Sequence, residues 1–213
     1  MIVSDRVVLV TGGAQRIGQA IALTLAARGA HVVISYRRSV REARLTLERL
    51  ERFGGRAAAF RVELSSATAI RWLFKRIEQR YGRLDVLVNS AANFHRVPFP
   101  QLSERDWGAA LDVNLKGPFL CALEASRLMR RNGRGGKIIN LADWAGIRPY
   151  RHYLPYCVSK AGLIGLTKAL AVELAPRIQV NAIAPGPILP PPGMGAEERR
   201  RVARRVPLKR WGS

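Results

Sequence analysis

The strongest constraint on the fold lies near the N-terminus, where an apolar run leads directly into a glycine-containing turn. Residues 7–10 form a continuous apolar run of the kind found in strands buried on both faces of a sheet. The turn 11–18 follows, and a helical pattern then continues to about Arg28, with Gly29 as the expected C-cap. A strand, a glycine turn and a helix in this order place helix N-terminal N–H groups where they can bind a pyrophosphate.

Short apolar runs and helical patterns alternate along the rest of the chain, which predicts an α/β fold. We expect one domain over residues 1–213, with a Rossmann-type doubly wound parallel sheet and helices on both faces. Strands are predicted at residues 7–10, 31–35, 57–62, 84–88, 137–141 and 179–184. Helices are predicted at residues 40–53, with Val40, Leu47 and Leu50 on its apolar stripe, at 67–81 and 103–131, and through Tyr156 to about residue 174.

The chain is strongly basic, with 36 lysine and arginine residues against 15 acidic ones and a net charge of +21. Such a charge makes nucleic-acid binding an alternative. The arginines are scattered, however, and aromatic residues do not interleave with them as a stacking surface requires. The densest run, residues 199–205, lies on a short predicted helix. We therefore interpret the charge as a solvated surface that favours anionic ligands and regard a nucleic-acid partner as the weaker hypothesis.

The sequence shows no pattern typical of a membrane or secreted protein. No apolar run is long enough to span a bilayer. The first apolar run enters its turn directly, so we predict a buried strand there and not a signal peptide. Cys121 and Cys157 provide neither a disulfide framework nor the spacing of metal ligands. We expect a cytoplasmic protein without a metal site.

The loop after the second predicted strand indicates the choice of dinucleotide. In dinucleotide-binding folds an acidic residue at this place accepts hydrogen bonds from the adenosine ribose and selects NAD. This chain has Tyr36, Arg37, Arg38 and Ser39 there instead. Two arginines and a serine suit a 2′-phosphate, so the loop favours NADPH, with a solvated pair of charges as the alternative.

Tyr156 and Lys160 are four residues apart and therefore share one face of a predicted helix. A phenol is a weak acid at neutral pH, because its pKa lies near ~10. A fixed ammonium nearby favours the phenolate and lowers that pKa, which makes the hydroxyl usable as a general acid or base. An ordinary helical pair is the alternative for these two residues alone.

Further candidate residues follow the carboxyl ends of other predicted strands, where ligands bind in open α/β sheets. The segment 89–94 contains small residues that allow the backbone to approach a cofactor closely, and Asp143 follows the fifth strand. The proline-rich segment 185–193 cannot be a central strand and is predicted to form a loop over the site. We interpret residues 187–206 as a substrate loop with a short helix.

Five segments in order and spacing resemble those of the short-chain dehydrogenase/reductase family over essentially the whole chain: Thr11-Gly12 to Gly18, Asn89-Ser90-Ala91-Ala92, Asn114, Tyr156 with Lys160, and Asn181 with Pro185-Gly186. The resemblance implies that Tyr156 is the acid/base, that Lys160 lowers its pKa and holds the nicotinamide ribose, and that Asn114 positions a water in a proton relay. The cofactor site would then comprise Gly12, Gln15, Arg16, Ile17, Gly18, Tyr36, Arg37, Arg38, Ser39, Glu63, Leu64, Asn89, Ser90, Ala91, Tyr156, Lys160, Pro185, Gly186 and Ile188.

Three positions depart from the usual pattern of that family. Arg16 and the segment 90–92 stand where the family usually has glycine and asparagine-alanine-glycine, and Asp143 stands at the position of the catalytic serine, thirteen residues before the tyrosine. Together with Phe94, these departures resemble the pteridine reductases. The resemblance implies that Arg16 contacts cofactor phosphate and pterin, that Phe94 stacks on the pterin, and that Asp143 and Tyr156 handle protons.

The chemistry of the two substrate classes supports the same interpretation. Ketone reduction builds negative charge on oxygen, which a neighbouring carboxylate opposes. Reduction of a pterin C=N bond instead needs a proton at nitrogen, and a carboxyl group can help to supply it or orient the tyrosine. Reduction of a pterin or dihydrofolate is therefore our leading hypothesis. A general carbonyl or 3-oxoacyl-thioester reductase remains open, as does a non-catalytic cofactor binder that has lost the serine.

A further helix and a seventh strand usually follow in the family and contribute to the tetramer interface. The sequence stops after the short helix near residue 205, so we predict a truncated sheet without these elements. One edge of that sheet should then expose apolar surface. A homo-tetramer or homo-dimer is the expected assembly of a full-length form.

Overall fold

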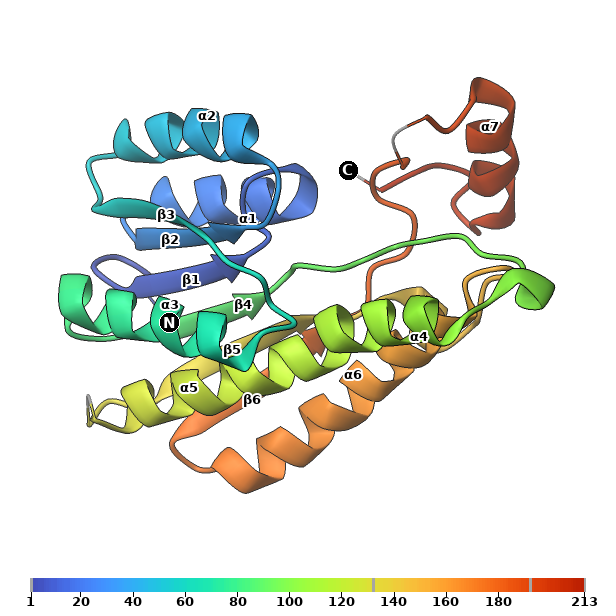
Figure 1. The fold of residues 1–213 in the computed structure, drawn as a ribbon. Coiled ribbons are helices and arrows are strands. Elements are labelled where there is room, and N and C mark those ends of the chain that lie inside the picture. Colours follow the sequence, from blue (N-terminus) through green and yellow to red (C-terminus); the bar gives the residue numbers. More distant parts are fainter. Residues whose placement is uncertain (1, 132, 192, 213) are drawn as a thin grey trace.

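The computed structural model describes residues 2–131, 133–191 and 193–212 and is built on a six-stranded sheet in the order β3-β2-β1-β4-β5-β6 (Figure 1). All five strand pairs are parallel. The strands are β1 (Val7–Thr11), β2 (His31–Tyr36), β3 (Ala57–Arg61), β4 (Val86–Asn89), β5 (Gly136–Leu141) and β6 (Ile178–Ile183). This topology confirms the predicted doubly wound α/β fold.

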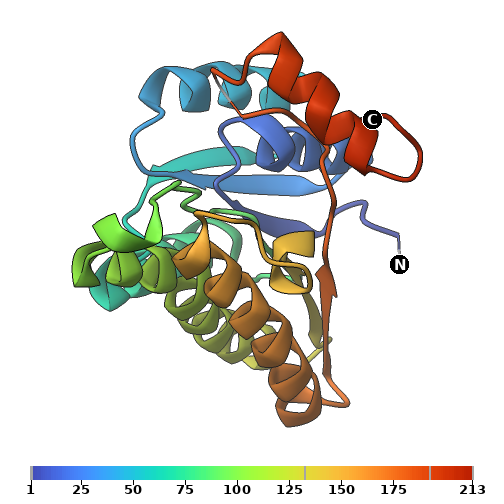
Figure 2. The same ribbon diagram turned by 90° about the vertical axis from the view of Figure 1, so that its right-hand side faces the viewer.

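Helices cover both faces of the sheet (Figures 1 and 2). One face carries α1 (Arg16–Ala26) and α2 (Val40–Glu51), and α7 (Ala196–Arg205) lies on the same side. The other face carries α3 (Ala67–Tyr81), α4 (Glu104–Leu111), α5 (Gly117–Arg131) and α6 (Leu154–Leu174). Strand β1 shows why the continuous apolar run of residues 7–10 predicted a strand buried on both faces. Val8 and Val10 pack toward α1 and α2, whereas Val7 and Leu9 pack into the opposite core, so every residue of the strand is buried.

The predicted boundaries of strands and helices agree with the observed ones within two residues at most ends. The apolar stripe of α2 was predicted wrongly at one position, because Val40 is 54% exposed. The buried positions of that helix are Ala43, Thr46 and Leu50. Thr46 is a polar residue that an apolar pattern cannot reveal; its hydroxyl donates to the Ala14 carbonyl and so fastens α2 to the glycine turn.

The predicted helix 103–131 is confirmed as helical backbone from Glu104 to Arg131, but the sequence did not reveal that its middle is π-helical. Ser103 and Asp106 form a capping box that starts α4 as expected. The chain then passes through a π-helical segment, Asp112–Lys116, before α5 begins. Pro118 explains the change, since proline has no N–H to donate and its ring clashes with the carbonyl of the residue four positions earlier in a regular α-helix. That residue is Asn114, a predicted catalytic residue.

Strand β6 forms one edge of the described sheet and pairs with β5. Ile183 on this strand is 53% exposed, and Val172 on the neighbouring α6 is 81% exposed. The edge of the sheet therefore carries apolar side chains in contact with solvent, as the sequence predicts. None of the helices in the described part of the chain combines the length and apolar character that crossing a membrane requires.

The opposite ends of the strands are held together by Asp85, which is 4% exposed. One carboxylate oxygen accepts a hydrogen bond from the Val7 N–H at 2.9 Å. The other oxygen pairs with Arg6 at 3.3 Å and with Arg83. Asp85 thus joins the start of β1 to the start of β4 and satisfies a backbone donor where the two strands begin.

We predict that Asp85→Ala lowers the free energy of unfolding by about 2 kcal/mol or more, because it leaves two partly buried guanidinium groups and one backbone N–H without their acceptor. Urea unfolding at neutral pH measures the change. Glu48→Ala is the matched control, since Glu48 pairs with Arg44 on the exposed surface of α2. Equal stability of the two variants would contradict the prediction.

Candidate active site

The predicted site residues meet at the carboxyl ends of β1, β4 and β5 (Figure 1). β1 has β2 on one side and β4 on the other, so the chain reverses its direction of winding between β1 and β4. This is the place where open α/β sheets bind their ligands. The glycine turn, the segment after Asn89, Asp143 and the N-terminal turns of α6 all lie at this edge.

Two glycines allow the turn after β1 to close against its neighbours. Gly12 has a φ of +65°, and a Cβ there would lie 2.8 Å from Cα of Ala91 in the segment after β4. A Cβ on Gly18 would lie 2.4 Å from the carbonyl oxygen of Gly12. A side chain at Gly12 would therefore push the turn away from the segment after β4, and one at Gly18 would separate α1 from the turn. Ile17, half-buried, follows in the first turn of α1.

The N-terminus of α1 has the donors that a pyrophosphate needs. Its N-cap residue, Gln15, makes no side-chain hydrogen bond to the first turn, and no acidic residue lies in that turn. The first N–H groups of this helix therefore have no side-chain cap and point into the site. The residues present fit a dinucleotide, which Gly12 and Gly18 would admit and the first turn of α1 would hold.

Arg16 has an unusual backbone conformation and an unexpected partner. Its φ is +55°, in the left-handed region that favours glycine. Its guanidinium donates to the carbonyls of Leu189 and Pro190, both at 3.0 Å. Arg16 thus ties the predicted substrate loop to the glycine turn, while the predicted contact with cofactor phosphate and pterin stays a prediction.

The four residues predicted to bind a 2′-phosphate lie together, with Tyr36 at the end of β2 and the other three directly after it. Arg37 pairs with Glu63 at 3.2 Å, so two predicted cofactor residues bind one another. Arg38 is exposed and makes no ion pair among the residues that the structure describes. Ser39 is the N-cap of α2 but makes no side-chain capping hydrogen bond. Arg38 is therefore the better-placed guanidinium for an additional phosphate, with Tyr36 beside it at the end of β2.

Two predicted cofactor residues direct their side chains into the protein. Asn89, 3% exposed, donates its amide to Asn140 at 2.9 Å, and Asn140 in turn donates to Thr167 at 2.9 Å. Leu64, 7% exposed, belongs to the hydrophobic core beneath α3 and α5. A cofactor contact by either residue would have to involve its backbone.

Thr11 was not singled out in the predicted cofactor site, although it shapes the site. Its hydroxyl oxygen accepts hydrogen bonds from the N–H groups of Ser90 at 3.0 Å and Ala91 at 3.2 Å. Thr11 therefore fixes the segment after β4 against the end of β1. A hydroxyl residue that directly precedes the glycine turn is the sequence signal that would have found it.

The centre of the site is a hydrogen bond between Tyr156 and Asp143. The tyrosine hydroxyl donates to the Asp143 carboxylate at 2.7 Å. The other oxygen of that carboxylate accepts from the Ala145 N–H at 2.7 Å, which makes Asp143 the N-cap of a short 3₁₀-helix, Trp144–Gly146. The structure thus brings the two predicted proton-handling residues together, thirteen residues apart in the sequence.

The pKa of Tyr156 was predicted in the wrong direction. Burial raises this pKa, and the negative charge and hydrogen bond of Asp143 raise it further. Lys160 does not reverse the effect, although its ammonium lies 5.7 Å from the centre of the Tyr156 ring. The tyrosine therefore holds its proton at neutral pH and is suited to donate it to a substrate.

Lys160 is almost completely buried, with 3% of its surface exposed. Its ammonium donates to the Leu141 carbonyl at 2.6 Å, which fastens α6 to the end of β5. Burial lowers the pKa of Lys160 to about 8, and the negative charge of Asp143 opposes this shift in part. The amine of Lys160 therefore loses its positive charge at mildly alkaline pH.

Asn114 lies fully buried in the π-helical segment, and protein groups satisfy its side chain. Its amide nitrogen donates to the Asn93 carbonyl at 2.9 Å and to the Ser159 hydroxyl at 3.0 Å, and its oxygen accepts from the Asn93 N–H at 2.7 Å. Asn114 therefore holds the segment after β4 against α6. Its predicted role in a water relay stays a prediction, and Ser159 is a partner that the sequence did not reveal.

Phe94 belongs to an aromatic group at the mouth of the site. Its ring stacks on Tyr153 with centroids 4.4 Å apart and meets Tyr156 edge to face at 4.7 Å. Phe94 remains 39% exposed, so part of its surface is available to a ligand. Tyr150 and Tyr153 complete the group and were not predicted, because they precede α6 without a recognisable spacing.

The proline-rich loop is attached to the segment that follows Asp143. The Pro185 carbonyl accepts from the Trp144 N–H at 3.1 Å, which ties the start of the loop to the segment after Asp143. Gly186 is exposed and Ile188 is half-buried, and Gly212 donates to the Pro187 carbonyl at 2.9 Å. The loop is therefore attached both to the catalytic segment and to the end of the described chain.

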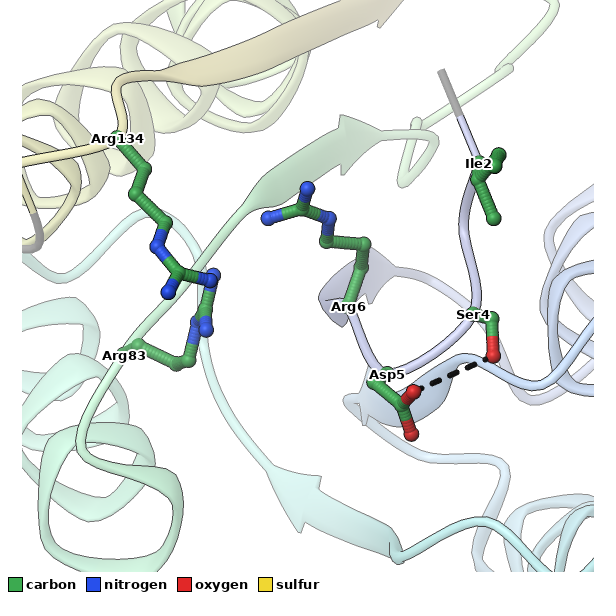
Figure 3. Close-up of a pocket in the computed structure, with 6 residues that line it drawn as sticks. All are labelled: Ile2, Ser4, Asp5, Arg6, Arg83 and Arg134. Carbon is green, nitrogen blue, oxygen red and sulfur yellow. Dashed lines mark hydrogen bonds between the residues drawn. The ribbon is translucent and has the colours of Figure 1, made fainter.

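A separate hollow lies where strands β1, β4 and β5 begin, at the opposite end of the strands from the candidate active site. Its volume is about 210 Å³, and Ile2, Ser4, Asp5, Arg6, Arg83 and Arg134 line it (Figure 3). Asp85 pairs with two of these arginines. Within residues 2–131, 133–191 and 193–212, no group of three or more metal-ligating side chains comes together.

Comparison with known proteins places the chain in a family. A model of the short chain dehydrogenase family matches residues 6–201, and the chain belongs to this family. It is 37% identical over 210 residues to the 3-oxoacyl-acyl-carrier-protein reductase of Synechocystis sp., covering 97% of this chain and 83% of that relative. It is 36% identical over 207 residues to the 3-oxoacyl-acyl-carrier-protein reductase FabG of Staphylococcus aureus (strain Mu50 / ATCC 700699), covering 96% and 84%.

A solved structure agrees closely with the whole described fold. FolM alternative dihydrofolate reductase 1 from Brucella canis, complexed with NADP, superposes with a TM-score of 0.91 and 35% sequence identity, covering 99% of this chain and 83% of that protein. The chain is therefore an oxidoreductase of the short-chain dehydrogenase family.

We predict a pH-dependent effect of Lys160→Met on stability. The folded pKa of Lys160, about 8, lies below the ordinary value of 10.5, so the folded state is penalised by a buried charge below pH 8 and relieved of it as the pH rises. From pH 8 to 9.5 the unfolding free energy of the wild type should rise relative to the variant by roughly 2 kcal/mol.

Urea unfolding of both proteins between pH 7 and 9.5 measures this difference. Lys168→Met is the matched control on the same helix, because Lys168 is exposed. It should show no such trend. Wild type and Lys160→Met profiles that run parallel over this range would show that burial does not perturb the amine.

Proposed function

We propose that this chain is an NADPH-dependent reductase that acts on the C=N bond of a pterin or dihydrofolate-like ring. The proposal rests above all on the hydrogen bond from the Tyr156 hydroxyl to the Asp143 carboxylate at 2.7 Å. NADPH, when bound, would supply the hydride. The residues of the chain would bind and orient the substrate ring and provide the proton.

The charge at the site supports a nitrogen acceptor over a ketone. Ketone reduction develops negative charge on oxygen, and the carboxylate of Asp143 beside the tyrosine hydroxyl would repel it. A C=N nitrogen is more basic than a ketone oxygen, so it can be protonated before the hydride arrives, and the ring then becomes neutral on reduction instead of anionic. The raised pKa of Tyr156 keeps the phenol protonated, so this side chain serves as the acid.

The mouth of the site supports a flat substrate. Phe94 is fixed between Tyr153 and Tyr156 yet keeps 39% of its surface exposed. A planar heteroaromatic ring can stack on such a face, which a flexible acyl chain does not require. The close structural likeness to a dihydrofolate reductase of the same family supports this substrate class.

Reduction of a 3-oxoacyl thioester is the second candidate. Two relatives named as 3-oxoacyl-acyl-carrier-protein reductases share 36–37% of their residues with this chain. Tyr156 and Lys160 would serve this reaction as well. The aspartate in place of the family's serine is the feature that argues against it.

We predict that the purified protein oxidises NADPH with dihydropteridine or dihydrofolate faster than with a 3-oxoacyl thioester. Asp143→Ser should lower pterin turnover by roughly 10-fold or more, because a hydrogen bond to a charged group is lost. It should leave or increase thioester turnover, since a hydroxyl donor suits a ketone. Absorbance at 340 nm follows all three substrates in parallel. Turnover of the thioester without turnover of dihydropteridine or dihydrofolate would contradict the pterin proposal.

We predict that Arg38 selects the phosphorylated dinucleotide. Arg38→Asp should weaken NADPH binding by roughly 10-fold or more and improve NADH binding, because a carboxylate repels the 2′-phosphate and accepts from ribose hydroxyls. Fluorescence titration gives both dissociation constants. Arg52→Asp is the matched control, since Arg52 is an exposed arginine at the C-terminal end of α2, the helix that follows Arg38. An unchanged NADPH-to-NADH ratio in Arg38→Asp would contradict the assignment.

A further inference from the structure

Three arginines converge on the hollow where β1, β4 and β5 begin, at the opposite end of the strands from the candidate active site. Arg6 directly precedes β1, Arg83 lies shortly before β4, and Arg134 lies shortly before β5. All three line the hollow, and in Figure 3 their side chains extend toward one another across it. Because β1, β4 and β5 are neighbours in the parallel sheet, the topology brings together cations that are far apart in the sequence.

The turn before β5 fixes the position of Arg134. Gly133 and Gly135 on either side of it have φ values of +67° and +68°, in the left-handed region that favours glycine. The N–H of Gly136 donates to the Arg177 carbonyl at 3.1 Å, which ties the turn to the residue that precedes β6. Arg134 is exposed and forms no ion pair with any other described residue. Its guanidinium is therefore available to a ligand.

Arg83 has a donor that the protein does not satisfy. Its Nη2 pairs with Asp85, but its Nε is buried and has no acceptor among the described residues. Arg6 donates to the same carboxylate through Nη1 alone, at 3.3 Å. A guanidinium carries five N–H donors, so both arginines keep most of theirs for other acceptors. A buried donor without a partner costs free energy, and a bound ion or water is a usual reason for one to persist.

Positive charge in the hollow exceeds negative charge. The single carboxylate of Asp85 compensates Arg6 and Arg83 together, and the third arginine is left without a counter-charge. Asp5 is the other acidic residue, and its carboxylate accepts from the Ser4 hydroxyl at 3.4 Å. In Figure 3 this carboxylate turns toward Ser4 and away from the guanidinium groups. Cations held close together repel one another, so an anion in the hollow would stabilise this arrangement.

We propose that the hollow binds a phosphate group, either of free inorganic phosphate or of a small phosphate monoester. A tetrahedral phosphate presents oxygens in several directions and can accept from guanidinium groups that approach from three strands, whereas one planar fork already matches a carboxylate. Its charge of about −1.5 to −2 near neutral pH exceeds that of a carboxylate. The volume of about 210 Å³ admits the group together with water. The site is separate from the dinucleotide site and does not depend on the proposed reaction.

Arg134→Gln removes one guanidinium from the hollow without touching Asp85 and its partners. Thermal unfolding is followed as sodium phosphate replaces sodium chloride at constant ionic strength, with NADPH present in excess to occupy the dinucleotide site. For the wild type we expect Tm to rise by roughly 3–6 °C at about ten times the phosphate dissociation constant. In Arg134→Gln that constant, obtained from the same curves, should be about 10-fold higher, because a charge-assisted contact is lost.

Arg71→Gln is the matched control, since it removes an exposed arginine from the first turn of α3 and leaves the hollow unchanged. It should keep the wild-type dissociation constant. Equal phosphate effects in the wild type, Arg134→Gln and Arg71→Gln would show a general effect of the salt and would overturn the proposal. The comparison of the variants holds whether or not NADPH binds, so it is independent of the proposed function.

Phenyl phosphate and acetate, titrated in the same way, identify the ligand chemistry. Ile2 lines the hollow and is 82% exposed, so it would contact the organic group of an ester. Tighter binding of phenyl phosphate than of inorganic phosphate would identify a monoester as the ligand, and equal or weaker binding would identify free phosphate. Acetate that binds as tightly as phosphate would contradict the assignment of a phosphate site.

The Nε–H resonance of Arg83 locates the anion in the unaltered protein. In a ¹H–¹⁵N spectrum, this resonance, assigned through the backbone, should shift as inorganic phosphate is added. The shift should saturate with the dissociation constant found by thermal unfolding, while the Nε–H resonance of Arg71 stays in place. A resonance of Arg83 that does not respond while phosphate stabilises the protein would place the anion elsewhere and reject this site.

Discussion

The hydrogen bond between Tyr156 and Asp143 joins α6 to the end of β5 and determines what the site can do. A phenol alone is a weak acid, and here the buried Tyr156 hydroxyl donates at 2.7 Å to a half-buried carboxylate. The carboxylate makes the phenolate costly, and the pKa of Tyr156 rises in consequence. Under the proposed function, the pair suits a substrate that takes up a proton without becoming an anion. This single contact separates the proposed chemistry from that of a ketone reductase, in which a serine hydroxyl occupies the place of the carboxylate.

Buried polar side chains hold Tyr156 and Asp143 at a fixed distance from one another. Asn89 on β4, Asn140 on β5 and Thr167 on α6 form a chain of hydrogen bonds, each of 2.9 Å, and Thr167 donates onward to the Leu163 carbonyl. Lys160 adds a contact between α6 and β5. Every link has both a donor and an acceptor, which is the condition under which a buried polar network stabilises a specific arrangement. The two strands and the helix that carry the site thus share one connected set of hydrogen bonds.

The sequence predicted the fold more fully than the electrostatics of the site. Strands that are buried on both faces of a sheet appear in the sequence as uninterrupted apolar runs. The chain has enough such runs to predict the parallel sheet. The π-helical segment before α5 was not predicted, because the effect of Pro118 on Asn114 depends on helix geometry and not on apolar periodicity. The pKa of Tyr156 was missed for a related reason. A spacing of four residues places Lys160 on the same helix face, but only the packed structure shows that Asp143 and burial act more strongly than the ammonium.

Arg16 connects the two halves of the site and carries a conformational cost. A φ of +55° costs an arginine about 1 kcal/mol relative to glycine. Two hydrogen bonds to the carbonyls of Leu189 and Pro190 offset that cost, but each is exposed to water and therefore contributes only about 0.5–1.5 kcal/mol. A pyrophosphate at the first turn of α1 presents a stronger acceptor to the same guanidinium than a carbonyl does. A dinucleotide bound there would then compete with the Leu189 and Pro190 carbonyls for Arg16, and this competition would couple the cofactor to the predicted substrate loop.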